Sequence, residues 1–328
     1  MKVLAADIGG TSTRLIYAEV DNNKKDILAE NIYYSYQYEN FNCLFDVFVA
    51  ENNINEKINK ACFAVAGPVK SGEASVTNLP WSMTEAQLSR SLNIPRVKLI
   101  NDFIAVAHGV AEIEDKDLVI LQQGTECPVN KDAAVVGAGT GLGASHLIWN
   151  NGCFLPKASE AGHAGFAPCN QLQCELLNWL QQQHTHVSVE MLLSGRGLKT
   201  IYQFLHEIKH IPESLIVKKT MRETDPAQVI SEYALAEKDL LCQRTLDCFI
   251  EIYGAAAGNI VLHYYPVSKL YIAGGIAAKI KNRMQRTCFI DALINKGPMS
   301  SNMKELTVKL VSQEKTGLYG ALSVAAGI

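Results

Sequence analysis

The stretch that decides the fold lies near the start of the chain, where residues 3–20 read VLAADIGGTSTRLIYAEV. An apolar run ends at Ile8 in a glycine-rich turn, and residues 13–20 then alternate between polar and apolar side chains. This pattern predicts a strand, a tight turn and a returning strand. A similar pattern begins again at Ala133, where residues 133–149 read AAVVGAGTGLGASHLIW. The repetition predicts two lobes, each built on such a hairpin.

The elements that follow the hairpins differ between the two halves of the chain. After the first hairpin, the spacing of apolar residues predicts a turn at 22–26, strands at 27–36, 61–66 and 97–100, and helices at 41–53, 84–92 and 103–113. The first lobe therefore has the predicted order βββαβαβα. The second half is more helical. Asp225-Pro226 begins a helical region that extends to about His263, followed by a buried strand at 267–272 and a helix from Thr316.

Length and composition restrict the possible functions. A chain of 328 residues predicts two domains. The contents of 48% hydrophobic and 19% charged residues are typical of a folded globular protein. The net charge of −3 comes without any block of Lys or Arg, so we expect no binding to nucleic acid. No apolar run approaches the ~18 residues of a membrane span, so we expect no association with a membrane.

Nine cysteines are scattered along the chain, and their odd number argues against a disulfide framework. No secretory signal precedes the first strand, so we expect a cytoplasmic protein with reduced, mostly buried thiols. A metal site is the alternative, because Cys169 and Cys174 lie close together in the sequence, with Cys153 and His163 upstream. Since no Cys-x-x-Cys pair is present, we predict no zinc site and no side chain that ligates a metal directly.

Glycine-rich turns follow three of the predicted strands, at Asp7–Thr11, Gly137–Gly143 and Ala273–Gly275. Glycine allows positive φ and close approach of the backbone, and the amides of such turns can bind phosphate oxygens. A tight structural turn explains any single one of them equally well. The three turns together, the first of them flanked by Asp, Thr and Ser, favour nucleotide binding.

Two common nucleotide-binding motifs do not fit these turns. A P-loop requires Lys after its second glycine, whereas the nearest match, Gly67–Glu73, has Glu at that position. A Rossmann fingerprint can be aligned with Gly139–Ala144, but that fingerprint must open a helix, and residues 144–149 are typical of a returning strand. The remaining option is the hairpin-type phosphate loop of the sugar kinase, Hsp70 and actin superfamily.

Several polar residues have both a structural and a functional interpretation. The pair Asn101–Asp102 lies between a strand and a helix, where it can cap the helix and where a carboxylate can accept the proton of an attacking hydroxyl. Glu160 and His163 fit a surface loop, half of a metal site, or hydrogen bonds to sugar hydroxyls. Glu190 follows Ser188, a predicted helix N-cap, where a carboxylate interacts favourably with the helix dipole.

Short stretches along nearly the whole chain resemble the bacterial glucokinase family. In order, they are DIGGT at 7–11, TNLPW at 77–81, INDF at 100–103, GAGTGLG at 137–143, EAGH at 160–163, FAP at 166–168, HVSVE at 186–190, LSGRGL at 193–198 and IAGGI at 272–276. Their shared order and approximate spacing make chance an implausible explanation. Cys169 and Cys174 do not complete the zinc motif of the related repressor and sugar-kinase group, which argues against a sugar-responsive transcription regulator.

The resemblance implies an α/β fold of two ribonuclease H-like lobes (βββαβαβα type) with a central cleft, the second lobe being enlarged by helices. In that family the C-terminal segment returns to the first lobe. The expected domains are therefore a smaller lobe of residues 1–112 plus 309–328 and a larger lobe of residues 113–308. The resemblance also implies a homodimer.

The resemblance further implies a glucokinase that transfers the γ-phosphoryl group of ATP to the 6-hydroxyl of glucose, with Mg²⁺ as cofactor, and so feeds glycolysis. Asp102 is then the general base, and the sugar is bound by Asn101, Glu160, His163 and Glu190, with Asn78 at the edge of its site. The expected nucleotide-binding residues are Ala6, Asp7, Ile8, Gly9, Gly10, Thr11, Gly139, Thr140, Gly141, Gly274 and Gly275, of which Asp7 is also an outer-sphere partner of Mg²⁺. Two alternatives stay open: a kinase for another hexose or an N-acetylhexosamine, and a catalytically silent sugar-sensing regulator.

Overall fold

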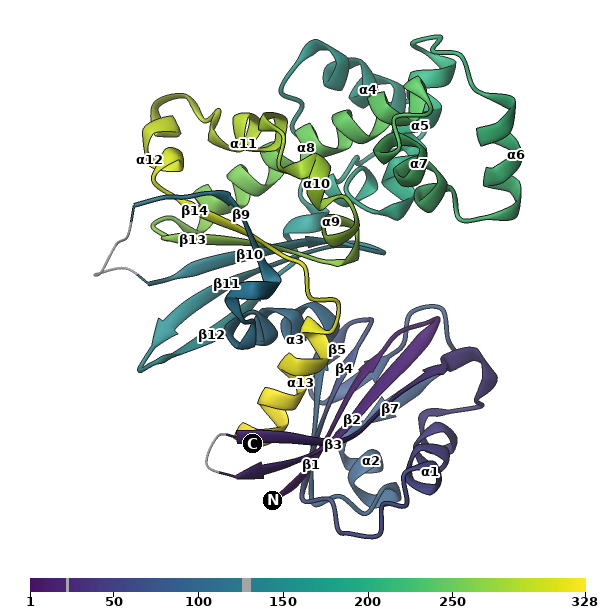
Figure 1. Cartoon of the computed structure of the whole chain (residues 1–328), viewed down its shortest axis with the longest axis vertical. Coiled ribbons are helices and arrows are strands. Elements are labelled where there is room, and N and C mark those ends of the chain that lie inside the picture. Colours follow the sequence, from purple (N-terminus) through teal and green to yellow (C-terminus); the bar gives the residue numbers. More distant parts are fainter. Residues whose placement is uncertain (22–23, 126–130) are drawn as a thin grey trace. The chain divides into compact units, whose positions relative to one another are not determined.

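The computed structural model describes residues 1–21, 24–125 and 131–328, so part of the predicted turn at 22–26 and Cys127 lie outside the described residues. The chain divides into two compact units, each folded around its own large sheet (Figure 1). The first unit comprises residues 1–114, 153–156 and 314–328. The second comprises residues 115–152 and 157–313.

The first unit is built on a five-stranded sheet with the strand order β3-β2-β1-β4-β8. The antiparallel strands are β1 (Lys2–Ile8), β2 (Ser12–Asp21) and β3 (Lys24–Tyr34), and β4 (Lys60–Val65) and β8 (Arg96–Asn101) extend the sheet parallel to β1. Alternate residues of β1 belong to separate cores on the two faces of the sheet. Burial on both faces explains why β1 is a continuous apolar run, and the predicted hairpin is confirmed.

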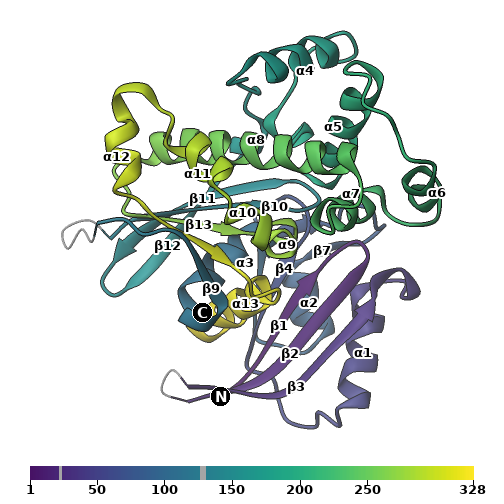
Figure 2. The same ribbon diagram turned by 45° about the horizontal axis from the view of Figure 1, so that its top comes forward.

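Helices cover both faces of this sheet (Figure 2). α1 (Phe41–Glu51) and α2 (Glu85–Ser91) share one core with it, and α3 (Asp102–Gly109) and α13 (Thr316–Gly327) share the other. Thr84 caps α2 by accepting a hydrogen bond from the Gln87 amide, as its sequence position predicts. The order βββαβαβα is confirmed.

A small sheet inserted into this order was not predicted. It consists of the short strands β5 (Val69–Lys70), β6 (Glu73–Ser75) and β7 (Ser82–Thr84). Its strands have only two or three residues each, too few for an alternating pattern to be recognised in the sequence. The loop between β6 and β7 carries Asn78, one of the predicted site residues.

α3 and α13 pack at unusually short distance because glycines face the partner backbone. A Cβ atom added to Gly320 would lie 1.8 Å from the Ala105 carbonyl oxygen, and one added to Gly109 would lie 1.9 Å from the Thr316 carbonyl oxygen. Only residues without a side chain fit at these two positions. Since α3 begins at Asp102, this packing fixes the helix that carries the predicted general base.

The second unit contains a six-stranded sheet with the order β12-β11-β10-β13-β14-β9. β10, β13 and β14 are parallel, and β11 and β9 pair antiparallel with their neighbours. The strands are β9 (Leu118–Gln122), β10 (Ala133–Ala138), β11 (Leu142–Asn150), β12 (Cys153–Ser159), β13 (Lys269–Ala273) and β14 (Thr307–Val311). The second predicted hairpin, β10–β11, is therefore confirmed.

The second unit also holds most of the helices. They are α4 (Gln171–Gln181), α5 (Gly195–Glu207), α6 (Leu215–Glu223), α7 (Pro226–Leu235), α8 (Leu240–Tyr264), α9 (Gly275–Lys279), α10 (Lys281–Met284), α11 (Thr287–Ile294) and α12 (Ser300–Lys304). The helical region predicted from Asp225 to about His263 is confirmed and consists of two helices, α7 and α8, because Asp239 caps a new helix by accepting a hydrogen bond from the Cys242 amide.

α8 bears on the expectation that the chain does not associate with a membrane. Among the described residues, α8 is a helix whose length and apolar composition would be sufficient to cross a membrane. However, 78% of its most apolar window is buried inside the protein, where it packs in one core with β10, β13, α5 and α11. The apolar residues of α8 therefore form the centre of the second unit.

The boundaries of the units differ in detail from the predicted domains. The last crossing between units lies between Gln313 and Glu314 rather than at 308–309, because β14 pairs with β13 and β9 in the second sheet. Residues 153–156, at the start of β12, group with the first unit. A β-strand pairing of this kind depends on distant partners and leaves no local mark in the sequence.

Candidate functional site

Three neighbouring parallel strands of the first unit end at the edge where two predicted site residues, Asp7 and Asp102, lie. In the register of the sheet, Ile8 at the end of β1 lies beside Val65 of β4, and Val65 lies beside Asn101 of β8. Asp7 and Asp102 are therefore carried to the same edge of the sheet by elements that are almost 100 residues apart in sequence. The carboxyl edge of parallel strands is the usual place for a binding site in α/β folds.

Asn101 and Asp102 combine the two interpretations that the sequence left open. Asn101 caps α3, because its Oδ1 accepts hydrogen bonds from the amides of Phe103 at 2.9 Å and Ile104 at 3.3 Å. Its Nδ2 donates to the Gly67 carbonyl oxygen at 3.1 Å. Asp102 Oδ1 accepts a hydrogen bond from the Phe103 amide at 2.8 Å. These contacts hold both side chains in place at the first turn of α3.

Burial makes the two aspartates weaker acids than usual. It raises the pKa of Asp7 to about 6, with a further contribution from the negative charge of Asp102 and an opposing one from Arg14. Burial also raises the pKa of Asp102, against the hydrogen bonds that favour its charged form. A Cβ atom added to Gly317 would lie 3.6 Å from Asp7 Oδ2, so this carboxylate faces the first turn of α13. Two partly buried carboxylates with raised pKa values at one edge are typical of a functional site.

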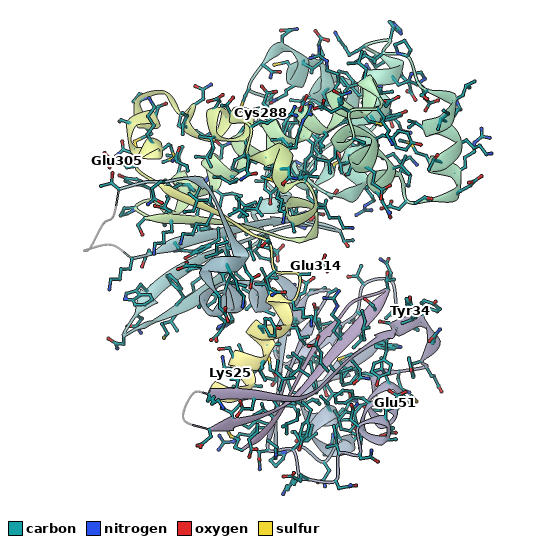
Figure 3. The ribbon with its side chains drawn as sticks, viewed as in Figure 1. Lys25, Tyr34, Glu51, Cys288, Glu305 and Glu314 are labelled. Carbon is teal, nitrogen blue, oxygen red and sulfur yellow. The ribbon has the colours of Figure 1, made fainter. Side chains whose placement is uncertain are left out.

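The turn after β1 is held by a residue that the sequence analysis did not single out. Ser35, fully buried after β3, donates its hydroxyl to the Gly9 carbonyl oxygen at 2.7 Å and its amide to the Thr11 carbonyl oxygen at 3.0 Å. Tyr34, labelled in Figure 3, lies opposite Ser12 and marks the place where β3 reaches this turn. No sequence signal linked Ser35 to the glycines, because the contact joins the turn after β1 to the residue after β3, 26 positions further along the chain.

Asn78 lies next to the same turn. A Cβ atom added to Gly10 would lie 2.6 Å from the Thr77 carbonyl oxygen and 3.4 Å from the Asn78 Cβ. Asn78 has a positive φ of 67°, a conformation that Asn adopts more readily than most residues. The structure thus brings Asn78 to the glycine turn of the first unit, with its side chain exposed.

The two glycine turns of the second unit are in direct contact with each other. Gly274 has a φ of +89°, and a Cβ atom at this position would lie 2.5 Å from the Ala138 carbonyl oxygen. The turn from Gly139 to Gly141 is closed by a hydrogen bond between its ends at 2.8 Å, and Gly139 accepts another from the Gly195 amide at 3.0 Å. Thr140, in the middle of the turn, is exposed. The predicted nucleotide-binding residues of this unit therefore form one continuous backbone surface.

Glu160, His163 and Glu190 gather around the start of β11. Glu190 Oε2 accepts a hydrogen bond from the Leu142 amide at 2.9 Å. A Cβ atom at Gly162 would lie 2.3 Å from the Leu142 carbonyl oxygen, which places the 160–163 segment against the same residue. The Glu160 carboxylate lies 3.9 Å from His163 Nε2, and the two side chains are 90% and 66% exposed. Such exposed, adjacent donors and acceptors are available to a polar ligand.

Ser188 lies at an N-cap position, as predicted, but without the predicted cap by its side chain. Only the short 3-10 helix Val189–Met191 follows, and the Ser188 side chain makes no capping hydrogen bond. The longer helix, α5, is capped by Ser194 instead. The Glu190 carboxylate therefore binds the backbone of β11, beside Gly141 of the glycine turn, instead of interacting with a helix dipole.

The chain shows no preformed metal site among the residues that the structure describes. No group of three or more His, Cys, Asp or Glu side chains is close enough there to hold an ion. Asp7 and Asp102 nevertheless supply carboxylate oxygens, the donors that Mg²⁺ prefers. This donor set fits a Mg²⁺ ion that is held mainly by a bound nucleotide and by water.

Comparison with known proteins decides the family. The sequence model described as glucokinase matches residues 4–327. A glucokinase of Trichormus variabilis is 40% identical over 344 aligned residues, covering 99% of this chain and 98% of the relative. The chain belongs to the glucokinase family.

Solved structures of glucokinases have the same fold. The glucokinase of an Antarctic psychrotroph superposes with a TM-score of 0.84 at 29% identity, covering 100% of this chain and 99% of the other. A glucokinase of Streptomyces griseus from the ROK family, solved in complex with glucose and AMPPNP, superposes with a TM-score of 0.68 at 20% identity and covers both chains completely. At that identity the second likeness concerns the fold alone.

Proposed function

We propose that this member of the glucokinase family phosphorylates glucose with ATP and that Asp102 is the general base. The observation that carries the assignment is the position of Asp102, partly buried at the carboxyl edge of the sheet and held by the Phe103 amide. A carboxylate with a raised pKa is a stronger base than an ordinary aspartate. It accepts the proton of the 6-hydroxyl as that oxygen attacks the γ-phosphorus of ATP, and the bond to the β-phosphate oxygen breaks.

The sugar is held, in this proposal, by Asn101, Glu160, His163 and Glu190, with Asn78 at the edge. Each sugar hydroxyl both donates and accepts hydrogen bonds, so carboxylates, an imidazole and amides match it. Glu190 Oε2 is already bound to the Leu142 amide, which fixes the carboxylate and leaves Oε1 to face a ligand. The glucose in the complex of the Streptomyces griseus relative supports this choice of substrate.

The nucleotide phosphates are bound, in this proposal, by backbone amides of the three glycine turns. The residues concerned are Ala6, Asp7, Ile8, Gly9, Gly10, Thr11, Gly139, Thr140, Gly141, Gly274 and Gly275. The AMPPNP in the same relative supports ATP as the phosphoryl donor. Mg²⁺ neutralises charge on the phosphates when bound, and Asp7 would hold it through water. We also propose that the protein is cytoplasmic and forms a homodimer. Light scattering of the purified protein tests the dimer.

A substitution at Asp102 tests the assignment. Asp102→Asn keeps an oxygen that can accept the Phe103 amide but removes the base, so turnover should fall by at least ~10²-fold with the fold intact. The measurement is ADP release in a coupled assay with glucose, ATP and Mg²⁺, together with circular dichroism. Asp46→Asn, an exposed change on α1, is the matched control and should leave turnover unchanged. Near-normal turnover of Asp102→Asn would contradict the role of this residue.

A panel of sugars in the same assay distinguishes the two alternatives. Preference for mannose, fructose or an N-acetylhexosamine over glucose would identify a kinase for another sugar. Sugar binding without ADP release would identify a sensor. The presence of Asp102, Glu160 and His163 together favours an enzyme, because a silent sensor has no need of the base.

A further inference from the structure

One fully buried hydroxyl lies beneath both glycine turns of the second unit. It belongs to Tyr253, in the middle of α8. The Tyr253 hydroxyl oxygen accepts a hydrogen bond from the Ala138 amide at 3.1 Å. It also lies 3.4 Å from the Val136 carbonyl oxygen and 3.5 Å from the Ala273 carbonyl oxygen, to either of which it can donate. The hydroxyl therefore joins α8 to two different strands.

Both strands lead directly into the turns. Ala138 is the last residue of β10 and precedes Gly139, and Ala273 is the last residue of β13 and precedes Gly274. The parallel pairing of the two strands ends at Gly137 and Ala273, so the Ala138 amide is beyond the ladder that joins them. At the point where this pairing stops, the Tyr253 hydroxyl links the two strands by its hydrogen bonds.

We propose that Tyr253 is a positioning residue for the nucleotide: its hydroxyl holds the Gly139–Gly141 turn and the Gly274–Gly275 turn in one fixed arrangement, so that their amides are preorganised for the phosphates of ATP. The inference rests on the proposed function, since it assumes that these turns bind the nucleotide. Preorganised amides bind without first being ordered, which lowers the cost of binding.

The aromatic ring of Tyr253 has a separate role, which allows the hydroxyl to be tested alone. The ring packs edge-on against Phe249 and Phe289, with centroid distances of 6.0 Å and 5.7 Å. Phenylalanine at position 253 keeps these contacts and removes only the oxygen, leaving the Ala138 amide without its partner. Any change in Tyr253→Phe therefore reports on the link to the strands.

The matched control is Tyr202→Phe. Tyr202 of α5 is also buried, and its hydroxyl donates at 3.4 Å to Oε1 of Glu213, which lies in the segment between α5 and α6 and outside the glycine turns. Loss of this bond removes a buried hydroxyl from the same unit without touching the strands. Comparison of the two variants separates the proposed effect from a general loss of stability.

The experiment measures the affinity for AMPPNP by calorimetry, the KM values for ATP and glucose, and backbone hydrogen exchange without ligand. In Tyr253→Phe we expect the Kd of AMPPNP and the KM of ATP to rise roughly tenfold, the loss of one hydrogen bond's contribution. The KM of glucose should stay within about twofold, and exchange should accelerate in peptides covering residues 138–143 and 273–276. Tyr202→Phe should show none of these changes.

The result that overturns the inference is an unchanged Kd of AMPPNP in Tyr253→Phe, or a rise equal to that in Tyr202→Phe. If Tyr253→Phe fails to fold, Gly274→Ala tests the same link from the other side, because its methyl group is forced against the Ala138 carbonyl oxygen. An unchanged Kd in that variant also overturns the inference. Failure of the proposed function is distinguishable, because the unaltered protein would then not bind AMPPNP at all.

Discussion

Replacing Asp7 by asparagine should stabilise the protein near neutral pH while lowering its activity. Burial and the charge of Asp102 raise the pKa of Asp7 from 3.8 to about 6. The folded state therefore holds the proton of this carboxyl group more tightly than the unfolded chain does. The contribution of Asp7 to the free energy of unfolding is thus highest below pH 3.8, falls as the pH rises, and reaches its lower level above about pH 6.

The size of the effect follows from the two pKa values. At 1.36 kcal/mol per pKa unit, the ionised Asp7 costs the folded state at most about 3 kcal/mol at pH 8. Asparagine has the same shape and no charge, so Asp7→Asn should recover most of this free energy at pH 8 and roughly half of it at pH 5. Its activity should fall, since Asp7 is the proposed outer-sphere partner of Mg²⁺.

Urea denaturation at pH 5 and pH 8 measures this difference for the unaltered protein and the variant. Asp46→Asn, which removes an exposed carboxylate from α1 of the same unit, is the control and should change stability by no more than about 0.5 kcal/mol. A variant that is less stable than the unaltered protein at pH 8 would refute the reasoning. So would a gain of the same size at both pH values, because titration of Asp7 requires a larger gain at pH 8.

Two further substitutions in the first unit test the packing of α13 on α3 and the hydrogen bond that holds the turn after β1. Gly320→Ala pushes a methyl group against the α3 backbone. We expect the free energy of unfolding to fall by about 2 kcal/mol, after the gain in helix propensity is subtracted, and the melting temperature to fall with it. Gly327→Ala on the same helix meets no atom within 4 Å and should not destabilise the protein. Ser35→Ala removes the hydrogen bond to the Gly9 carbonyl oxygen. We expect the free energy of unfolding to fall by about 1–3 kcal/mol and the KM for ATP to rise. Ser231→Ala, which removes a comparable buried hydroxyl from α7, should leave that KM unchanged, and an equal KM in both serine variants would contradict the role of Ser35.

Much of the fold and part of the site could be predicted because they depend on local sequence. A strand, a glycine turn and a returning strand leave a pattern within twenty residues, and both hairpins were found in this way. Helix caps such as Thr84 and Asn101 bond to amides two or three residues away, so the residue type and its position were sufficient. Ser188 also precedes a helix, but it is a 3-10 helix of three residues, and the Ser188 side chain does not cap it.

Other features could not be predicted because they join distant parts of the chain. The three short strands β5, β6 and β7 were missed, and so was the core role of α8, whose burial depends on the sheet and helices around it. Ser35 and Tyr253, which hold the glycine turns, carry no motif. Their contacts bridge 26 and 115 residues respectively. Hydrogen bonds of that range produce no periodicity in the sequence.

The sequence by itself determined the two hairpins, the glycines at their turns and the order of the polar residues that match the glucokinase family. These features follow from backbone sterics and from short-range hydrogen bonds, which act within a few residues. The tertiary structure alone decided how Asp7 and Asp102 share one edge, how deeply they are buried, and therefore how far their pKa values rise. Desolvation depends on every group that surrounds a side chain, and those groups come from β1, α3 and α13, whose positions in the sequence are far apart.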